Sequence, residues 1–194
     1  EYERVKSHSL NSVRQILRLN ADHSLKSKLV LPPFEHHLGI DLSGYPQSNR
    51  KAPISLLGRI LAVADHYAAM TSSRSYRKVP ISQDVALKIM MEEAGTVIDP
   101  VVLKIFIEMM GIYPVGSLLV LDTREVALAA RPPPEADNGR PIVCILSRGR
   151  DNKIRKSKYL DLSERHPETG EFLRNITQCF HPSVFGIQPA DFLV

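Results

Sequence analysis

Two adjacent histidines, His36 and His37, lie in a segment rich in proline and glycine, and Asp41 follows four residues later. Adjacent imidazoles on a constrained loop can hold one metal ion or a bridged pair, and a nearby carboxylate can fix a ring tautomer by accepting a hydrogen bond. The alternative is two surface histidines beside a turn, because the pair alone specifies no geometry. We predict that His36 and His37 bind metal and that Asp41 supports their rings.

A single carboxylate, Asp65, follows the apolar run 61–64. A carboxylate buried in such a helix must be paired, metal-bound or protonated, because burying it bare is unfavourable by several kcal/mol. It could instead pair with Arg59 or Arg74 at a helix edge. His8, among apolar positions of an expected helix, is by itself more often a hydrogen-bonded core histidine than a ligand. The candidate metal ligands are His8, His36, His37 and Asp65.

Three basic residues, Arg74, Arg77 and Lys78, follow the helix that carries Asp65. Guanidinium groups match phosphate oxygens in two-point geometry, so the cluster could bind an anionic substrate near a metal. The alternative is a solvated helix end, where cations are favoured in any case. We predict that these residues bind phosphate.

The elements that position these residues are mostly helical as far as Gly111. Apolar spacing predicts helices over residues 2–19 and 54–72, and a further helix begins at Ser82 and is closed by Gly95. Asp99 and Pro100 then begin a helix that ends at Gly111. The Pro- and Gly-rich residues 31–53 read as a shaped loop. Beyond Tyr113, short β-branched runs predict an antiparallel meander with strands over residues 117–122, 126–130, 141–147 and 159–162.

Composition is that of an ordinary folded protein, with 43% hydrophobic and 24% charged residues. The net charge of +4 and the 6% aromatic content do not indicate a nucleic-acid partner, and no apolar run has the length of a membrane span. Cys144 and Cys179 lack metal-type spacing, so we expect a cytoplasmic protein. The chain begins at Glu1 without Met or a signal-like segment, and we expect it to be part of a longer protein.

Six separated motifs occur in a defined order along the chain. They are His8, His36-His37, 41–46, 59–65, 71–77 and 94–100. Together they resemble the HD-GYP family of bacterial cyclic di-GMP phosphodiesterases over about residues 1–112. The β-rich residues 113–194 resemble an extension often found after such domains.

This resemblance implies a mainly α fold, an HD-type helical bundle over residues 1–112, followed by a small antiparallel β-rich C-terminal extension over residues 113–194. It implies two or three divalent metals, often iron or manganese, that activate a water for attack on a phosphodiester. By resemblance, His8, His36, His37 and Asp65 fall on ligand positions. The expected ligand is cyclic di-GMP or a related nucleotide. Gly44, Tyr45 and Pro46 would shape the site and contact a signalling-protein partner.

Three positions depart from the family pattern, because Leu38, Leu42 and Ala68 stand where the family has Glu, Gly and Asp. A leucine cannot accept a hydrogen bond from a ligand imidazole, which weakens support for the metals. The His-Asp pair that names the superfamily should precede Glu1. One hypothesis is therefore a degenerate signalling module that binds a cyclic dinucleotide or a partner with impaired or no hydrolysis. The other is an active metal-dependent phosphodiesterase completed by upstream residues.

Overall fold

The computed structural model describes residues 2–47, 49, 51–73, 79–132 and 139–193. The chain divides into two compact units, Glu1–Ala69 with Ile89–Ile105 and Met70–Lys88 with Phe106–Val194. A helical N-terminal region is followed by a five-stranded antiparallel sheet within the described residues. The expectation of a mainly α protein is therefore wrong. The fold is mixed α/β, because the sheet is larger than a minor extension.

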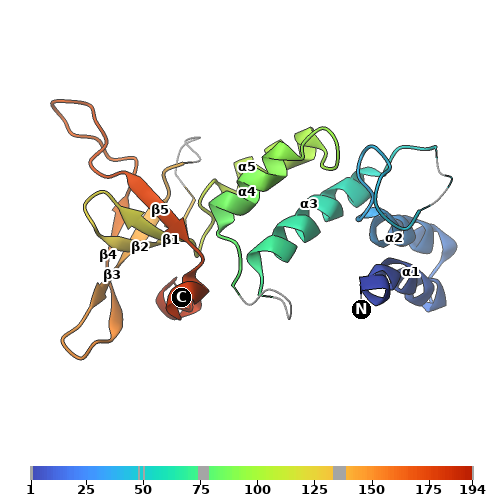
Figure 1. Ribbon diagram of the computed structural model, residues 1–194, viewed down its shortest axis with the longest axis horizontal. Helices are drawn as coiled ribbons and strands as arrows, with labels where there is room; N and C mark the ends of the chain where they lie inside the picture. The colour runs from blue at the N-terminus through green and yellow to red at the C-terminus, as the bar shows by residue number, and fades with distance from the viewer. Residues whose placement is uncertain (1, 48, 50, 74–78, 133–138, 194) are drawn as a thin grey trace. The chain divides into compact units, whose positions relative to one another are not determined.

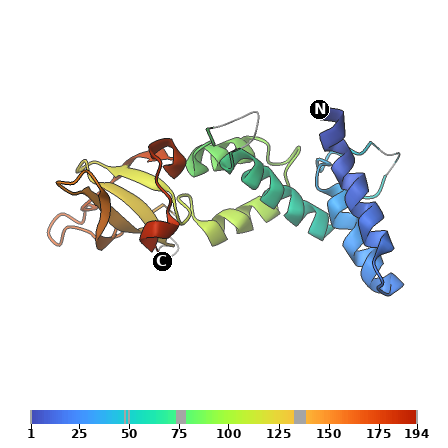
Figure 2. The ribbon, with the colours of Figure 1, turned by 90° about the horizontal axis from the view of Figure 1, so that it is seen from below.

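The first two helices, α1 (Tyr2–Arg18) and α2 (His23–Glu35), lie side by side (Figures 1 and 2). Asp22 caps α2 by accepting a hydrogen bond from the Leu25 N–H at 2.8 Å. The loop expected to begin at residue 31 is wrong there, because α2 continues through Pro32 and Pro33 to Glu35. Proline has no backbone N–H, so these two prolines leave two carbonyls of the preceding turn without a hydrogen-bond donor. Those carbonyls belong to exposed residues, where water can reach them.

Three further helices follow the predictions closely: α3 (Leu56–Thr71), α4 (Gln83–Glu92) and α5 (Pro100–Met110). Asp99 caps α5, because its Oδ1 accepts hydrogen bonds from the N–H groups of Val101 and Val102 at 2.8 and 3.0 Å. Gly95 and Gly111 adopt positive φ beyond α4 and α5, as expected for residues that end helices. Among the described helices, none has the length and apolar character needed to cross a membrane.

The sheet has the strand order β4-β3-β2-β1-β5. Three predicted strands are confirmed as β1 (Leu118–Leu121), β2 (Val126–Arg131) and β3 (Ile142–Arg148). The fourth, β4 (Ile154–Asp161), begins earlier than predicted because its charged first half pairs with β3. The sequence analysis missed β5 (Ile176–Phe180), which pairs with β1 across a long separation in sequence.

Both faces of the sheet are partly covered. Leu119, Ala127 and Val143 belong to the core on one face. The other face contains Leu118, Leu128, Leu146 and Ile187. Here the C-terminal 3-10 helix η1 (Pro182–Phe185) and the short α6 (Ala190–Leu193) lie beside the sheet (Figure 2). Burial of these aliphatic side chains stabilises the sheet unit.

A buried carboxylate joins the end of α2 to the start of α3. Glu35 is fully buried, and its Oε2 accepts hydrogen bonds from the backbone N–H and the hydroxyl of Ser55. Gly58 lies against it, since a Cβ at this position would meet Oε2 and lie 2.9 Å from the Glu35 Cβ. The absence of a side chain at Gly58 is therefore what permits this close contact.

We predict that Gly58→Ala lowers the free energy of unfolding by about 1–3 kcal/mol, because the added methyl overpacks the Glu35 contact. Replacing glycine by alanine inside a helix normally stabilises it by up to ~1 kcal/mol. Urea denaturation measures the difference. A stabilised Gly58→Ala variant would contradict the packing described here.

Candidate metal centre

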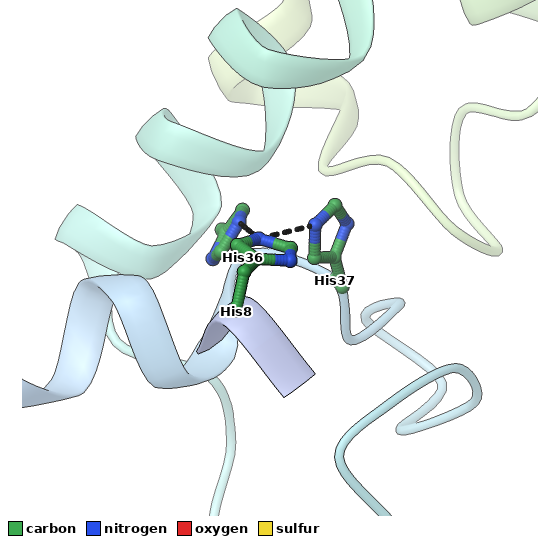
Figure 3. Close-up of side chains that lie close together, drawn as sticks. All are labelled: His8, His36 and His37. Carbon is green, nitrogen blue, oxygen red and sulfur yellow. Dashed lines mark hydrogen bonds between the residues drawn. The ribbon is translucent and has the colours of Figure 1, made fainter. Parts of the chain in front are cut away.

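Three imidazole rings from two separate segments converge in the helical unit. The Nε2 atom of His8, on α1, lies 3.1 Å from the Nε2 atoms of both His36 and His37, at the end of α2. The ligand atoms of the three residues all lie within 4.8 Å of one another. Figure 3 shows the His8 ring between the other two, joined to them by the dashed contacts.

The ring of His36 is oriented by its own helix. Its Nδ1 lies 2.9 Å from the Pro33 carbonyl oxygen. A carbonyl can only accept, so Nδ1 carries a proton and donates it. In a neutral ring the other nitrogen, Nε2, is then unprotonated. The lone pair of His36 Nε2 therefore faces His8.

The loop after α2 folds back to hold His37. The Tyr45 N–H donates to the His37 carbonyl at 3.2 Å, and the Tyr45 ring stacks on the His37 ring with centroids 4.5 Å apart. Gly44 has a φ of 93°, and a Cβ there would collide with the His37 carbonyl oxygen. Only glycine fits this position without strain, so Gly44 and Tyr45 position His37.

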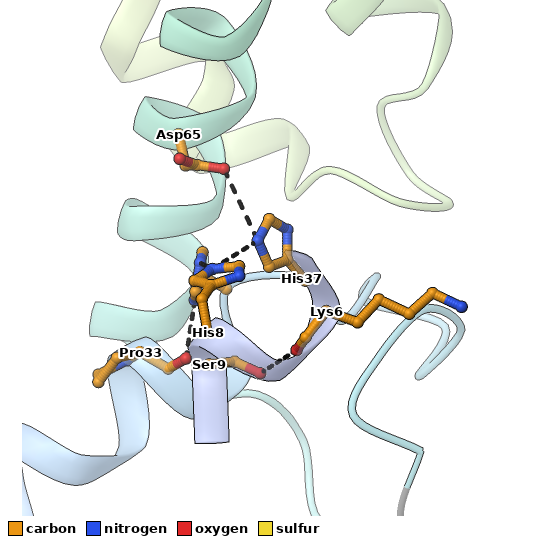
Figure 4. A network of polar contacts seen from close by, with 7 residues as sticks. Lys6, His8, Ser9, Pro33, His37 and Asp65 are labelled. Atoms are coloured by element: carbon orange, nitrogen blue, oxygen red, sulfur yellow. Dashed lines mark hydrogen bonds and ion pairs between the residues drawn. The ribbon is translucent and has the colours of Figure 1, made fainter. Parts of the chain in front are cut away.

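Asp65 approaches the cluster from α3. Its Oδ2 lies 4.0 Å from His37 Nε2, and Figure 4 shows its carboxylate directed toward the rings (Figure 4). The side chain is 39% exposed, so Asp65 is less buried than the apolar sequence around it indicated. Its proposed pairing with Arg59 is not found among the described contacts, because Arg59 binds Asp99 instead.

The surroundings of His36 and His37 keep both of these imidazole rings neutral. Burial lowers the pKa of His36. Burial, followed by the charge of His36, lowers the pKa of His37 to about 4, although Asp65 acts in the opposite direction. Neutral imidazole is the form that binds metal, so at neutral pH both rings are ready to act as ligands.

This donor set fits a divalent transition metal. Two imidazole nitrogens bound at about 2.1 Å to one cation lie roughly 3.0–3.4 Å apart when they occupy neighbouring positions. The two separations from His8 Nε2 fall in this range. Nitrogen donors with a nearby carboxylate suit zinc, iron or manganese rather than calcium. The cluster therefore offers suitable donor atoms close enough together to hold a metal ion.

The other predicted site residues have separate placements. Asp41 is exposed, and its Oδ1 accepts a hydrogen bond from the Ser43 N–H at 2.9 Å. It thus stabilises the turn, whereas the Pro33 carbonyl fixes the tautomer of His36. The predicted phosphate-binding residues lie outside the described residues, and they are Arg74, Arg77 and Lys78.

A cleft of about 530 Å³ opens beside the cluster. Tyr45 connects the two, since it stacks on His37 and also lines the cleft together with Gly44 and Pro46. Lys6 provides a cationic side chain in the lining, and it extends away from the rings in Figure 4. The cleft is therefore large enough for a small molecule, and its lining includes one cationic side chain.

Comparison with known proteins identifies this helical region. A family model described as the HD domain matches residues 1–102. The chain belongs to the HD domain family. The match covers His8, His36, His37 and Asp65, so all four predicted ligands lie within the HD domain.

The HD domain is related to cyclic dinucleotide phosphodiesterases. A cyclic di-GMP phosphodiesterase of Pseudomonas aeruginosa is 37% identical over 123 residues, which are 63% of this chain and 28% of that protein. A cyclic di-GMP phosphodiesterase of Thermotoga maritima is 31% identical over 110 residues, or 56% of this chain and 29% of that protein. A 3'3'-cGAMP-specific phosphodiesterase of Vibrio cholerae is 44% identical over 66 residues, or 34% and 14%. The chain thus spans less than a third of these relatives, and the resemblance to HD-GYP phosphodiesterases is confirmed.

Sequence analysis missed several residues that organise this HD domain. Glu35 anchors the end of α2 through Ser55, yet it carries no signal beyond a charged residue beside two histidines. His66, next to Asp65, lies 3.0 Å from a carboxylate oxygen of Glu93, a contact between segments that spacing cannot indicate. Only the proline before the histidines, whose carbonyl holds His36, was visible as an unusual feature of the sequence.

We predict that Mn²⁺ raises the melting temperature of the protein and that His8→Ala abolishes this shift, because His8 is shared by both imidazole contacts. A ligand at 100 times its dissociation constant stabilises the native state by about 2.7 kcal/mol. Thermal unfolding followed by circular dichroism measures the shift.

The matched control is His23→Ala, an exposed histidine at the start of α2, which should retain the full response to Mn²⁺. An equal response in the His8→Ala and His23→Ala variants would show that the cluster does not bind the cation.

Proposed function

We propose that the HD domain of this chain holds a divalent metal and serves the hydrolysis of a phosphodiester bond in a cyclic dinucleotide. The observation that carries the proposal is the convergence of the Nε2 atoms of His8, His36 and His37, with the Asp65 carboxylate beside them. The names of the related phosphodiesterases support the class of substrate.

The residues of the chain have distinct roles in this proposal. His8, His36 and His37 hold the metal, and Asp65 completes its ligands or orients a water beside them. When bound, a divalent cation lowers the pKa of water and neutralises charge on a phosphate. Gly44 and Tyr45 keep His37 in place. The metal identity expected by resemblance, iron or manganese, is part of the proposal.

In this proposal, the substrate binds in the cleft beside Tyr45. Its aromatic ring and Lys6 line the same cleft, an arrangement that suits a nucleotide with a flat base and an anionic phosphate. Phosphate binding by Arg74, Arg77 and Lys78 stays a prediction. Contact of the Gly44–Pro46 loop with a signalling-protein partner also stays a prediction, separate from the positioning role of this loop.

The second candidate is a module that binds the nucleotide with impaired or no hydrolysis. It is favoured by Leu42, which has a φ of 64° at the position where the resembling family has glycine. Leu38, at the position of the family's Glu, is only 5% exposed and offers no hydrogen-bond acceptor from its side chain. Both replacements remove features that an active site of this type would use to orient its ligands.

We predict that the full-length natural protein loaded with Mn²⁺ hydrolyses cyclic di-GMP and that Asp65→Asn lowers the rate more than about 100-fold. Losses of 10–100-fold already follow from removing groups that only orient metal ligands. Chromatography of the linear and mononucleotide products measures turnover.

Asp22→Asn is the control, because asparagine caps a helix about as well as aspartate and this residue lies at the start of α2. Nucleotide binding by a metal-loaded protein without turnover would contradict the hydrolytic proposal and establish the second candidate.

We predict that Leu42→Gly raises the free energy of unfolding by about 1 kcal/mol, because a left-handed conformation is unfavourable by about 1–2 kcal/mol for residues with a side chain. Leu42→Ala is the matched control, since alanine removes the same exposed side chain but keeps the strain. Urea denaturation compares the two, and equal stabilities would show that the backbone at this turn is unstrained.

A further inference from the structure

The hairpin that joins β3 to β4 accounts for the net positive charge of the protein. Residues 148–158, which we name the basic hairpin, contain six Lys and Arg residues and one Asp, a net charge of +5. The other 183 residues carry a net charge of −1. The cations are Arg148, Arg150, Lys153, Arg155, Lys156 and Lys158.

The cations of the basic hairpin are exposed and little neutralised. All six are exposed to solvent. Within the described residues only Arg155 makes an ion pair, with Asp151 at 2.7 Å. The pKa of Glu125 is lowered chiefly by a hydrogen bond from Arg174, with a small contribution from Lys158. The protein itself therefore leaves most of this charge available to an outside partner.

The cations lie on both faces of the basic hairpin, not on one face alone. Strand pairing places Lys156 opposite Leu146 and Arg155 opposite Ser147, so these two cations point to opposite faces. Arg150 and Lys153 belong to the connection at the tip. In Figure 1 the β3–β4 connection extends beyond the end of the sheet. The basic hairpin is thus a projecting ribbon with cations on both faces and at its tip.

An acidic segment makes the charge of the sheet unit asymmetric. The strand β4 leads away from the basic hairpin to residues 161–171, which contain four acids and one arginine. The strand β4 is about 25 Å long, so the tip of the basic hairpin and the acidic segment lie at opposite ends of this strand. In Figure 1 the two connections extend from opposite ends of the sheet. A polyanion would be attracted to the basic end and repelled from the acidic end.

We propose that the basic hairpin binds the phosphate backbone of duplex nucleic acid without reading its sequence. A two-stranded ribbon fits the major groove of DNA, which is about 12 Å wide and bordered by phosphates on both sides. Cations on both faces of the ribbon can reach both borders. Arginine and lysine contacts to phosphate position a protein without selecting bases.

The distribution of side chains favours this partner over a lipid membrane. A flat anionic surface would use one face of the ribbon, and binding is usually strengthened by apolar side chains that enter the bilayer. The tip, Arg150–Lys153, contains no apolar residue, and Ile154 lines a pocket on the sheet. Lysines on an edge strand also prevent sheets from pairing with one another, but Arg148 and Arg150 precede that edge strand.

The test is fluorescence anisotropy of a labelled 20-base-pair DNA duplex with the full chain, in EDTA so that the imidazole cluster binds no metal. Binding should weaken as KCl rises from 50 to 200 mM, with a slope of log affinity against log salt of about −3 to −4 for roughly four phosphate contacts. The triple variant Arg150→Gln, Lys153→Gln and Lys156→Gln should reduce the slope by about 3.

The control is Lys28→Gln, Lys88→Gln and Arg131→Gln, which removes the same net charge at exposed positions outside the basic hairpin. It should keep the wild-type slope, and circular dichroism verifies that both triple variants fold. Equal weakening by the two triple variants, no DNA binding at 50 mM KCl, or binding to phosphatidylserine vesicles in place of DNA would each overturn the proposal.

Discussion

The convergence of the His36 and His37 imidazoles, both with pKa values lowered by burial, on the Nε2 atom of His8 is the constraint that the helical unit has to satisfy. The Pro33 carbonyl fixes the proton of His36 on Nδ1, so its Nε2 presents a lone pair toward His8. One proton on His8 Nε2 cannot bond well to two neighbours in different directions. A divalent cation accepts lone pairs from all three rings. The proposed metal would therefore satisfy this geometry better than hydrogen bonding does.

Contacts outside the cluster keep this geometry in place. Glu35 precedes the two histidines directly and binds Ser55 before α3, which ties the end of α2 to the helix that carries Asp65. On the same helix, Arg59 binds Asp99, the cap of α5. Each polar contact joins a helix that carries a candidate ligand, or leads into one, to the start of another helix. The position of the site is therefore linked to the stability of the helical unit.

Local signals in the sequence were the ones that predicted structure well. The limits of α5 follow from Asp99 and Gly111, because caps act on adjacent residues. The strand β5 pairs with β1 more than fifty residues away, and no local pattern specifies such a partner. Convergence of His8 with His36 was expected from family motifs. The contact of Pro33 with His36 was not, because it depends on α2 continuing through two prolines where a loop was expected. The net charge of +4 likewise did not reveal the basic hairpin, because a sum over the whole chain does not show where the charge lies.

The central claim is that His8, His36 and His37 bind one common metal centre. X-ray absorption spectroscopy of the Mn²⁺-loaded protein tests it most directly, because imidazole ligands add characteristic scattering from the outer ring atoms. The account predicts a first shell with nitrogen and oxygen donors and an imidazole contribution that decreases in His8→Ala. A spectrum of hydrated Mn²⁺ without imidazole scattering, unchanged by His8→Ala, would contradict it.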